Sequence, residues 1–223
     1  TTGFVLNLSG SSGIWIDNAT DVCLINNVRC WPFATVDGDP TLGNRNGISY
    51  KTSTNADLTK FTNCFSWGYI EGFEINGCNG VELSNCSADH DQNNNTNSYG
   101  FMLLNNCTNV KVIGCSSSGK NRNFYVDLTT SSNSIAFVDC SSFVASAAGL
   151  VIAHGNVTIN SCSFYYSPLA IQVGNSTSKV FIDLCYFYGI TTLPIQLTNT
   201  NNNIFIGKQN DYGDWTNGSS VTN

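Results

Sequence analysis

Apolar residues recur along this chain in short alternating phrases. Each phrase has two alternate positions, mostly apolar, and a terminal residue three positions later. Six consecutive phrases end in cysteine: Thr59/Phe61/Cys64, Val81/Leu83/Cys86, Val110/Val112/Cys115, Ile135/Phe137/Cys140, Val157/Ile159/Cys162 and Val180/Ile182/Cys185. Val22/Leu24/Asn27 and Ile204/Ile206/Gln209 extend the series to eight units with polar terminal residues. Alternation with period two predicts short strands with one buried face.

A second apolar phrase, often introduced by Gly, precedes each unit. These phrases are Ile14/Ile16, Ile48/Tyr50, Phe73/Ile75, Phe101/Leu103, Phe124/Val126, Leu150/Ile152, Ile171/Val173 and Ile195/Leu197. From Cys64 onward the terminal positions lie 22 to 29 residues apart, a period typical of solenoids. No stretch has sustained helical spacing, which argues against leucine-rich repeats. The sequence therefore predicts an all-β fold, a single-stranded right-handed parallel β-helix of about eight coils or more.

Length and composition limit the possible functions. Residues 1–223 are expected to form one domain, and the strand pattern at Phe4 and Leu6 suggests a piece of a longer β-helix. Charged residues make up only 11%, so Asn, Ser and Thr must cover much of the surface. The net charge of −6 argues against nucleic acid as a partner. No apolar run reaches the about 18 residues of a membrane span.

The six terminal cysteines are predicted to form one inward ladder of free thiols. In-register neighbours would place their Cβ atoms about 4.8 Å apart, whereas a disulfide requires about 3.8 Å. An oxidised framework is the competing interpretation of ten cysteines. The states of Cys23, Cys30, Cys78 and Cys107, which lie off the ladder, stay open. No CxxC pair is present, so we predict no zinc site, no other metal and no cofactor.

On these repeated phrases, the chain resembles the pectin-lyase-like parallel β-helices, and among them the shaft of a bacteriophage tailspike or capsule depolymerase. The resemblance implies a homotrimer on the virion tail that binds and cleaves bacterial surface polysaccharide, with a secreted or cell-surface protein as the alternative location. The sequence departs from related enzymes: "AHGN" offers only His154-Gly155 where polygalacturonases carry Gly-His-Gly. No residues of this sequence can be matched to the calcium-binding carboxylates and the Arg base of pectate lyases.

Two long turns mark the expected binding region, because loops on rigid scaffolds concentrate binding groups. One runs from Trp31 to Gly47 and the other from Asp89 to Gly100, both at the same predicted corner two coils apart. The short turn between them carries Trp67, Tyr69 and Glu71. We expect a trough with aromatic residues on its floor and carboxylates on its sides.

The predicted catalytic residues are Glu74, Asp89 and Asp91, since glycoside cleavage commonly uses paired carboxyl groups. Asp89 should share an outward column with Trp67. The predicted substrate-binding residues are Trp67, Tyr69, Glu71, His90, Arg45, Arg122, Asp37 and Asp39. The alternative for Asp89, Asp91, Asp37 and Asp39 is an ordinary role in turns. Asp89 and Asp91 also open a partial calcium-loop pattern that lacks its Gly and Glu positions.

Other polar residues have simpler structural explanations. Lys60, Glu82 and Lys111 are expected to form an outward charge ladder, which excludes Glu82 from catalysis, and His154 is expected to be structural. Phe143, Tyr165 and Tyr188 should form one outward aromatic column, and Phe181 and Phe205 another. Exposed columns of this kind favour a subunit interface, with a second sugar platform as the alternative.

Three classes of function are therefore open. The first is a polysaccharide hydrolase or lyase. The second is a sugar-binding adhesin or receptor-binding spike without catalysis. The third is a purely structural shaft.

Overall fold

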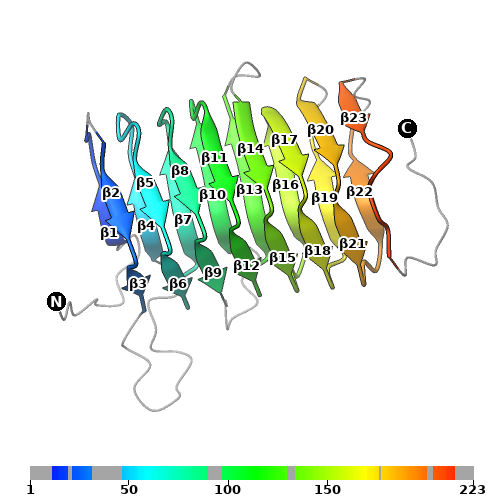
Figure 1. The fold of residues 1–223 in the computed structure, drawn as a ribbon, viewed down its shortest axis with the longest axis horizontal. Helices are drawn as coiled ribbons and strands as arrows, with labels where there is room; N and C mark the ends of the chain where they lie inside the picture. Colours follow the sequence, from blue (N-terminus) through cyan, green and yellow to red (C-terminus); the bar gives the residue numbers. More distant parts are fainter. Residues whose placement is uncertain are drawn as a thin grey trace, which may run out of the picture.

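The computed structural model describes residues 12–19, 22–31, 47–89, 97–129, 134–175, 177–199 and 203–213. They form a parallel β-solenoid with three sheets, whose strands stack in chain order from one end of the molecule to the other (Figure 1). The predicted all-β parallel β-helix is thus confirmed. Within these ranges no helix is long and apolar enough to cross a membrane.

Each coil contributes one strand to each sheet, except that the last coil has no strand in sheet C. Sheet A contains β1 (Ser12–Ile16), β4 (Ile48–Thr52), β7 (Glu71–Asn76), β10 (Tyr99–Asn105), β13 (Arg122–Leu128), β16 (Ala148–His154), β19 (Leu169–Val173) and β22 (Leu193–Leu197). Sheet B contains β2 (Leu24–Asn26), β5 (Lys60–Thr62), β8 (Glu82–Ser84), β11 (Val110–Ile113), β14 (Ser134–Val138), β17 (Asn156–Asn160), β20 (Lys179–Asp183) and β23 (Ile204–Ile206). Sheet C contains β3 (Arg29–Cys30), β6 (Phe65–Trp67), β9 (Ser87–Asp89), β12 (Ser116–Ser118), β15 (Ser141–Phe143), β18 (Ser163–Tyr165) and β21 (Tyr186–Tyr188).

The solenoid has about six turns, fewer than the predicted eight. The first and last coils are incomplete. Strand β3 has only two residues, and after β23 the described chain meets sheet C only through an isolated bridge between Tyr186 and Asp211.

The predicted inward phrases of the six cysteine-ended units and the phrase Ile204/Ile206 are correct, but the phrase of the first unit is shifted. In the first coil, Ile25 pairs with Phe61, so Cys23 and Ile25 are the partly buried residues, whereas Val22 and Leu24 are exposed. Its terminal position is taken by Val28, which precedes the Arg29–Phe65 pair, and not by Asn27.

Two further phrases are corrected by the register. In the second coil Tyr50 aligns with Phe73, so the inward pair is Tyr50/Thr52 and not Ile48/Tyr50. At the C-terminal end, the bridge from Tyr186 to Asp211 places Asn210 opposite Cys185, where Gln209 was predicted. The side chain of Asn210 accepts a hydrogen bond from the Cys185 amide at 2.9 Å.

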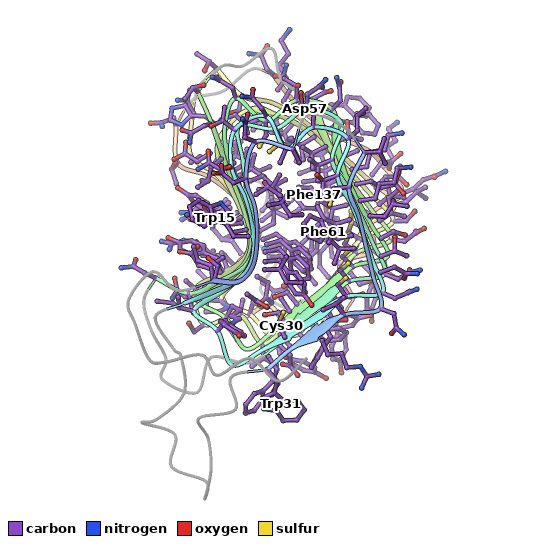
Figure 2. All side chains as sticks on the ribbon, turned by 90° about the vertical axis from the view of Figure 1, so that its left-hand side faces the viewer. Trp15, Cys30, Trp31, Asp57, Phe61 and Phe137 are labelled. Atoms are coloured by element: carbon purple, nitrogen blue, oxygen red, sulfur yellow. The ribbon has the colours of Figure 1, made fainter. Side chains whose placement is uncertain are left out.

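Stacked rings fill the interior of the first half of the solenoid. Tyr50, Phe73, Phe101 and Phe124 lie one above the other, with ring centroids 4.5, 4.8 and 5.2 Å apart and planes within 15° of parallel. Phe61 and Phe137 meet this column edge-on from sheet B (Figure 2). Offset and edge-to-face contacts are the favourable geometries for aromatic pairs, so this column supplies much of the packing energy.

The corner between sheets B and C explains the recurring cysteine. The residue before it adopts a positive φ, for example 53° at Asn63 and 52° at Asn85, a conformation that Asn tolerates better than most residues. The chain then turns, and the thiol donates to a carbonyl of the preceding coil, as from Cys86 to Phe61 at 3.4 Å and from Cys140 to Val112 at 3.2 Å. A small apolar side chain with one weak donor suits this crowded position.

All ten cysteines are free thiols, which confirms the predicted ladder and settles the four off-ladder residues. Nine are buried and Cys23 is partly exposed. A hydrogen bond to Cys115 is the largest cause that raises the pKa of Cys86 to about 12. Burial raises the pKa of Cys107 to about 11. The thiols of Cys86 and Cys107 are therefore uncharged and poorly reactive at neutral pH.

Candidate functional site

The outer face of sheet A is concave, because the sheet curves inward along the whole solenoid (Figure 2). One outward column on this face runs in register through Trp15, Lys51, Glu74, Met102 and Tyr125. The exposed fraction falls from 59% at Trp15 to 6% at Glu74. A carboxyl group this shielded on an outward face needs explanation, because burying a charge is costly.

A bend in β7 brings a second carboxyl group to Glu74. Gly72 and Phe73 both face the interior, and a Cβ atom at Gly72 would lie 2.6 Å from the Cβ of Ala88 in sheet C. Because two consecutive residues point inward, the alternation is broken. Glu71 and Glu74 therefore reach the same side of the strand and share a hydrogen bond.

The electrostatics of this site favour protonation of Glu71. Burial is the largest cause that raises the pKa of Glu71 to about 7, followed by the negative charge of Glu74, while Lys51 and Lys120 act in the opposite direction. Lys51 lies 3.6 Å from Glu74 and forms an ion pair with it. The buried Oε2 of Glu71 has no hydrogen-bond partner among the described residues.

An arginine held between two tyrosines lies in the same register column as Glu71. Arg122 aligns with Tyr99, and Tyr99 aligns with Glu71, so Arg122 lies two coils from the pair, about 10 Å at the usual strand spacing. Its guanidinium group lies 5.6 Å from the centre of the Tyr99 ring and 5.9 Å from that of Tyr125. It also donates to the Tyr99 hydroxyl at 3.3 Å. No described carboxylate forms an ion pair with Arg122, so its remaining donors can bind an anion.

The far rim of the same face carries a histidine and an aspartate. A register shift after Val126 places His154 opposite Asp127, and His154 Nδ1 lies 2.9 Å from Asp127 Oδ1. Tyr125 donates to the other carboxylate oxygen at 3.3 Å. His154, expected to be structural, is therefore an exposed, oriented side chain on the concave face.

The predicted trough is divided between two sheets. Trp67 and Asp89 do share a column, as expected, but it lies on the outer face of sheet C. Glu74 lies on the outer face of sheet A, so the structure does not bring Glu74 and Asp89 together. Trp31 packs against Trp67 with ring centroids 5.0 Å apart. The sheet C column is therefore an aromatic pair beside a carboxylate, separate from the Glu71–Glu74 pair.

Tyr69 does not line an open surface. Its side chain is 1% exposed and belongs to the core, where burial raises its pKa to about 12. The prediction that its ring holds a sugar is corrected accordingly. Asp37, Asp39, Arg45, His90 and Asp91 lie outside the described residues.

Other parts of the described surface offer less chemistry. Among the described residues, no group of three or more His, Cys, Asp or Glu side chains could hold a metal ion. A hollow of about 400 Å³ at the corner of sheets B and C is lined by Asn27, Arg29, Asn63, Cys64, Phe65, Asn85 and Ser87. A hollow of about 300 Å³ on sheet B is lined by Ser134, Asn156, Val157, Thr158, Lys179, Val180, Phe181, Asn203 and Phe205. Neither hollow is lined by a carboxyl group, so neither offers acid–base groups comparable with Glu71 and Glu74 on sheet A.

Sequence reasoning missed several residues of the concave face: Trp15, Lys51, Lys120, Tyr99 and Tyr125. A signal existed for three of them, because Trp15, Lys51 and Tyr125 occupy the same position as Glu74, between the two inward residues of a strand. Lys120 gave none, since a lysine in the turn "SGKN" resembles any solvated residue.

No known family, no curated protein and no solved structure matches the chain in sequence or fold comparisons.

Proposed function

We propose that this chain binds a polysaccharide along the concave face of sheet A and that Glu71 and Glu74 form its acid–base group. The observation that carries the proposal is the hydrogen-bonded, shielded carboxyl pair with a pKa of about 7 at Glu71. A group that titrates near neutral pH both donates and accepts protons efficiently.

The surroundings of the pair suit a chain of sugars that lies along the solenoid axis. Trp15 lies two coils before Glu74 and Tyr125 two coils after it in the same column, about 10 Å on each side. Aromatic side chains at these positions provide apolar contacts for sugar rings on both sides of the carboxyl pair. Arg122 provides a site for a carboxylate or another anionic substituent.

The separation of the two carboxyl groups limits the mechanism. Hydrolases that use paired carboxyl groups hold them about 5–5.5 Å or 6.5–9.5 Å apart, to leave room for a nucleophile or a water. Hydrogen-bonded carboxyl groups are closer, so Glu71 and Glu74 act together as one proton donor or acceptor. They can protonate the leaving glycosidic oxygen in hydrolysis or remove a carbon-bound proton in elimination.

A second candidate function is sugar binding without cleavage. It is favoured by Trp31, Trp67 and Asp89 on sheet C, which place an aromatic pair beside a carboxylate away from the concave face. In that case the protein is an adhesin or a receptor-binding spike. Either version of the proposal includes a homotrimer on a virion tail. Each subunit of this trimer would be a right-handed solenoid of the tailspike type.

The test is incubation of the protein with a panel of bacterial capsule and O-antigen polysaccharides, followed by mass analysis of released oligosaccharides. Unsaturated products indicate a lyase, and hydrated products indicate a hydrolase. Binding without any release supports the second candidate. Neither release nor binding across the panel contradicts both and favours a structural shaft.

A further inference from the structure

The far rim of the concave face carries a second cluster of ionisable side chains, outside the carboxyl pair. His154 Nδ1 lies 2.9 Å from Asp127 Oδ1, and the Tyr125 hydroxyl donates to the other carboxylate oxygen at 3.3 Å. Both oxygens of Asp127 are therefore engaged, one by its own strand, β13, and one by β16 of the next coil. The carboxylate is held in place from two sides.

The histidine reaches this position through an irregularity in the sheet. Val126 aligns with Ile152, and the next residue, Asp127, aligns with His154. Ala153 is therefore an extra residue without an aligned partner in β13. An extra residue of this kind re-aims a neighbouring side chain, and such bulges are frequent beside functional sites. Here the bulge sets the imidazole against the carboxylate while 49% of the His154 side chain stays exposed.

The contact with Asp127 decides which ring nitrogen carries the proton. An ionised carboxylate only accepts hydrogen bonds, so in the neutral ring Nδ1 is protonated and Nε2 keeps its lone pair. Among the described residues, Nε2 has no hydrogen-bond partner. An accessible imidazole that is oriented in this way by a carboxylate is suited to act as a general base.

The nucleophile for such a base is water, because no Ser, Thr or Cys side chain of the described ranges hydrogen-bonds to His154. Water activated by a base attacks the carbonyl carbon of an ester directly, whereas a glycosidic bond also needs protonation of its leaving oxygen. Acyl groups are common ester substituents of sugar hydroxyls. A glycan in contact with the Tyr125 ring would therefore present them beside His154.

We propose that His154 is the general base of a second activity, the hydrolysis of O-acyl esters on a polysaccharide bound along the concave face. Its Nε2 takes a proton from water as the water oxygen bonds to the acyl carbon. The bond between that carbon and the sugar oxygen then breaks, and the sugar oxygen keeps the electron pair. It receives the proton from His154, which leaves a free acid and a sugar hydroxyl. Asp127 and Tyr125 are positioning residues.

The polysaccharide as substrate rests on the proposed function, but the ester chemistry does not. The experiment therefore follows hydrolysis of 4-nitrophenyl acetate and, separately, release of acetate from O-acetylated members of the polysaccharide panel. The protein should hydrolyse 4-nitrophenyl acetate at least about tenfold faster than free imidazole at equal concentration. His154→Gln should lower both rates by about 10²-fold or more.

Two further variants separate the base from its surroundings. Asp127→Asn should lower both rates by about tenfold or more, since an amide can donate to Nδ1 and so move the ring proton to Nε2. The control is Lys60→Gln, which removes an exposed lysine 3.8 Å from Glu82 on sheet B and should keep full rates.

The pH profile separates a catalytic role from a structural one. The titratable side chains that face His154 in the described chain are Asp127 and Tyr125 of β13. Strand β10 supplies Leu104 in register with Asp127, and after β19 Gly174 donates to the backbone of β16. Both rates should fall toward acid pH, because the protonated ring has no lone pair to accept a proton from water.

Rates that are unchanged in folded His154→Gln, or that stay flat toward acid pH, overturn the proposal. If His154→Gln does not fold, Asp127→Asn decides in the same way. Hydrolysis of 4-nitrophenyl acetate without acetate from any O-acetylated polysaccharide overturns the assignment to sugar esters. Acetate release without chain cleavage supports the esterase and contradicts the proposed cleavage alone. Chain cleavage without hydrolysis of either ester contradicts the esterase alone.

Discussion

At the scale of single residues, the molecule is distinguished by ionisable groups held in shielded places. Glu71 and Glu74 face a concave surface, Lys120 lies in the interior, and nine thiols line the core. Several thiols donate hydrogen bonds to carbonyls of the preceding coil, Glu74 forms an ion pair with Lys51, and Lys120 donates to the Tyr69 carbonyl. Their shielded environments therefore depend on the stacked solenoid and should be lost when it unfolds.

The raised pKa of Glu71 links stability to pH. A carboxyl group with a pKa of about 7 in the folded state and 4.5 as its ordinary value binds its proton more tightly when folded. Stability from this group is thus present below about pH 4.5 and is lost as pH rises through about 7. Glu71→Gln should therefore raise the free energy of unfolding at pH 8 by about 1–2 kcal/mol, with allowance for solvent screening, and leave it nearly unchanged at pH 4.5. Denaturant unfolding at both pH values measures this, and an equal effect at the two would contradict it.

The thiols should differ in reactivity according to burial. Native protein should react quickly with a thiol reagent at Cys23 and slowly at the other nine cysteines, because only Cys23 is partly exposed. After denaturation all ten should react. Equal reactivity in both states, or intact-mass evidence for a disulfide among Cys64, Cys86, Cys115, Cys140, Cys162 and Cys185, would refute the free-thiol ladder.

At the scale of strands, the bends in sheet A create both the packing and the site. At Gly72, Gly100 and Gly149 the chain approaches sheet C so closely that a side chain has no room. The residue just before a bend, such as Glu71 before Gly72 or Tyr99 before Gly100, turns toward the concave face. Glycine is needed here for space, because no positive φ is involved at these three positions.

Replacement of these glycines should therefore destabilise the solenoid. In Gly100→Ala the new Cβ atom would lie 2.0 Å from Ser117 Oγ and 2.5 Å from the carbonyl oxygen of Asn123, so the backbone must shift. The expected loss is about 1–3 kcal/mol in the free energy of unfolding. Gly174→Ala is the matched control, since its nearest neighbour lies 3.6 Å away. Equal destabilisation of the two variants in denaturant unfolding would show that the close approach is not the cause.

Strand patterns predicted the interior coils better than the ends. At "VCLIN" four consecutive apolar residues, Val22 to Ile25, fit either phase of alternation, so the sequence alone does not fix which of them face inward. At the other end, "GKQN" contains no apolar residue that could fix the terminal position. The sequence predicts Gln209 there, whereas the structure places Asn210. Register in these places comes from pairing with the neighbouring coil, which a single sequence does not reveal.

The candidate site was predictable only in part for the same reason. Glu74 was expected to face outward and does so, because it lies between the inward residues Phe73 and Ile75. Its partner was expected in Asp89, one corner away. The bend at Gly72 selects Glu71 instead, and such a bend interrupts the alternation on which the prediction depended.

At the scale of the whole molecule, two exposed aromatic ladders run along the later coils, as predicted. Phe143 stacks on Tyr165 at 4.8 Å with planes 4° apart, and Tyr188 continues that column. Phe181 stacks on Phe205 at 4.9 Å with planes 5° apart. Parallel rings at this spacing cover each other's faces and expose mainly their edges. Edges suit packing against another protein surface better than stacking on a sugar ring.

We therefore expect the protein to self-associate through these ladders, as a trimer. Sedimentation should show three times the monomer mass, and Phe143→Ser combined with Tyr165→Ser should weaken the assembly by at least tenfold in dissociation constant. Trp15→Ser, on the concave face, is the control and should not change it. A monomer at all accessible concentrations would exclude this role for the ladders.

The central claim, that the Glu71–Glu74 pair is the acid–base group of a polysaccharide-cleaving protein, is tested most directly by turnover of three glutamine variants. Glu71→Gln and Glu74→Gln should each lower turnover by about 10²–10⁴-fold while glycan binding survives. Glu82→Gln, in the exposed pair with Lys60, should keep full turnover, since its carboxyl group lies on sheet B. Full turnover in both Glu71→Gln and Glu74→Gln would contradict the account.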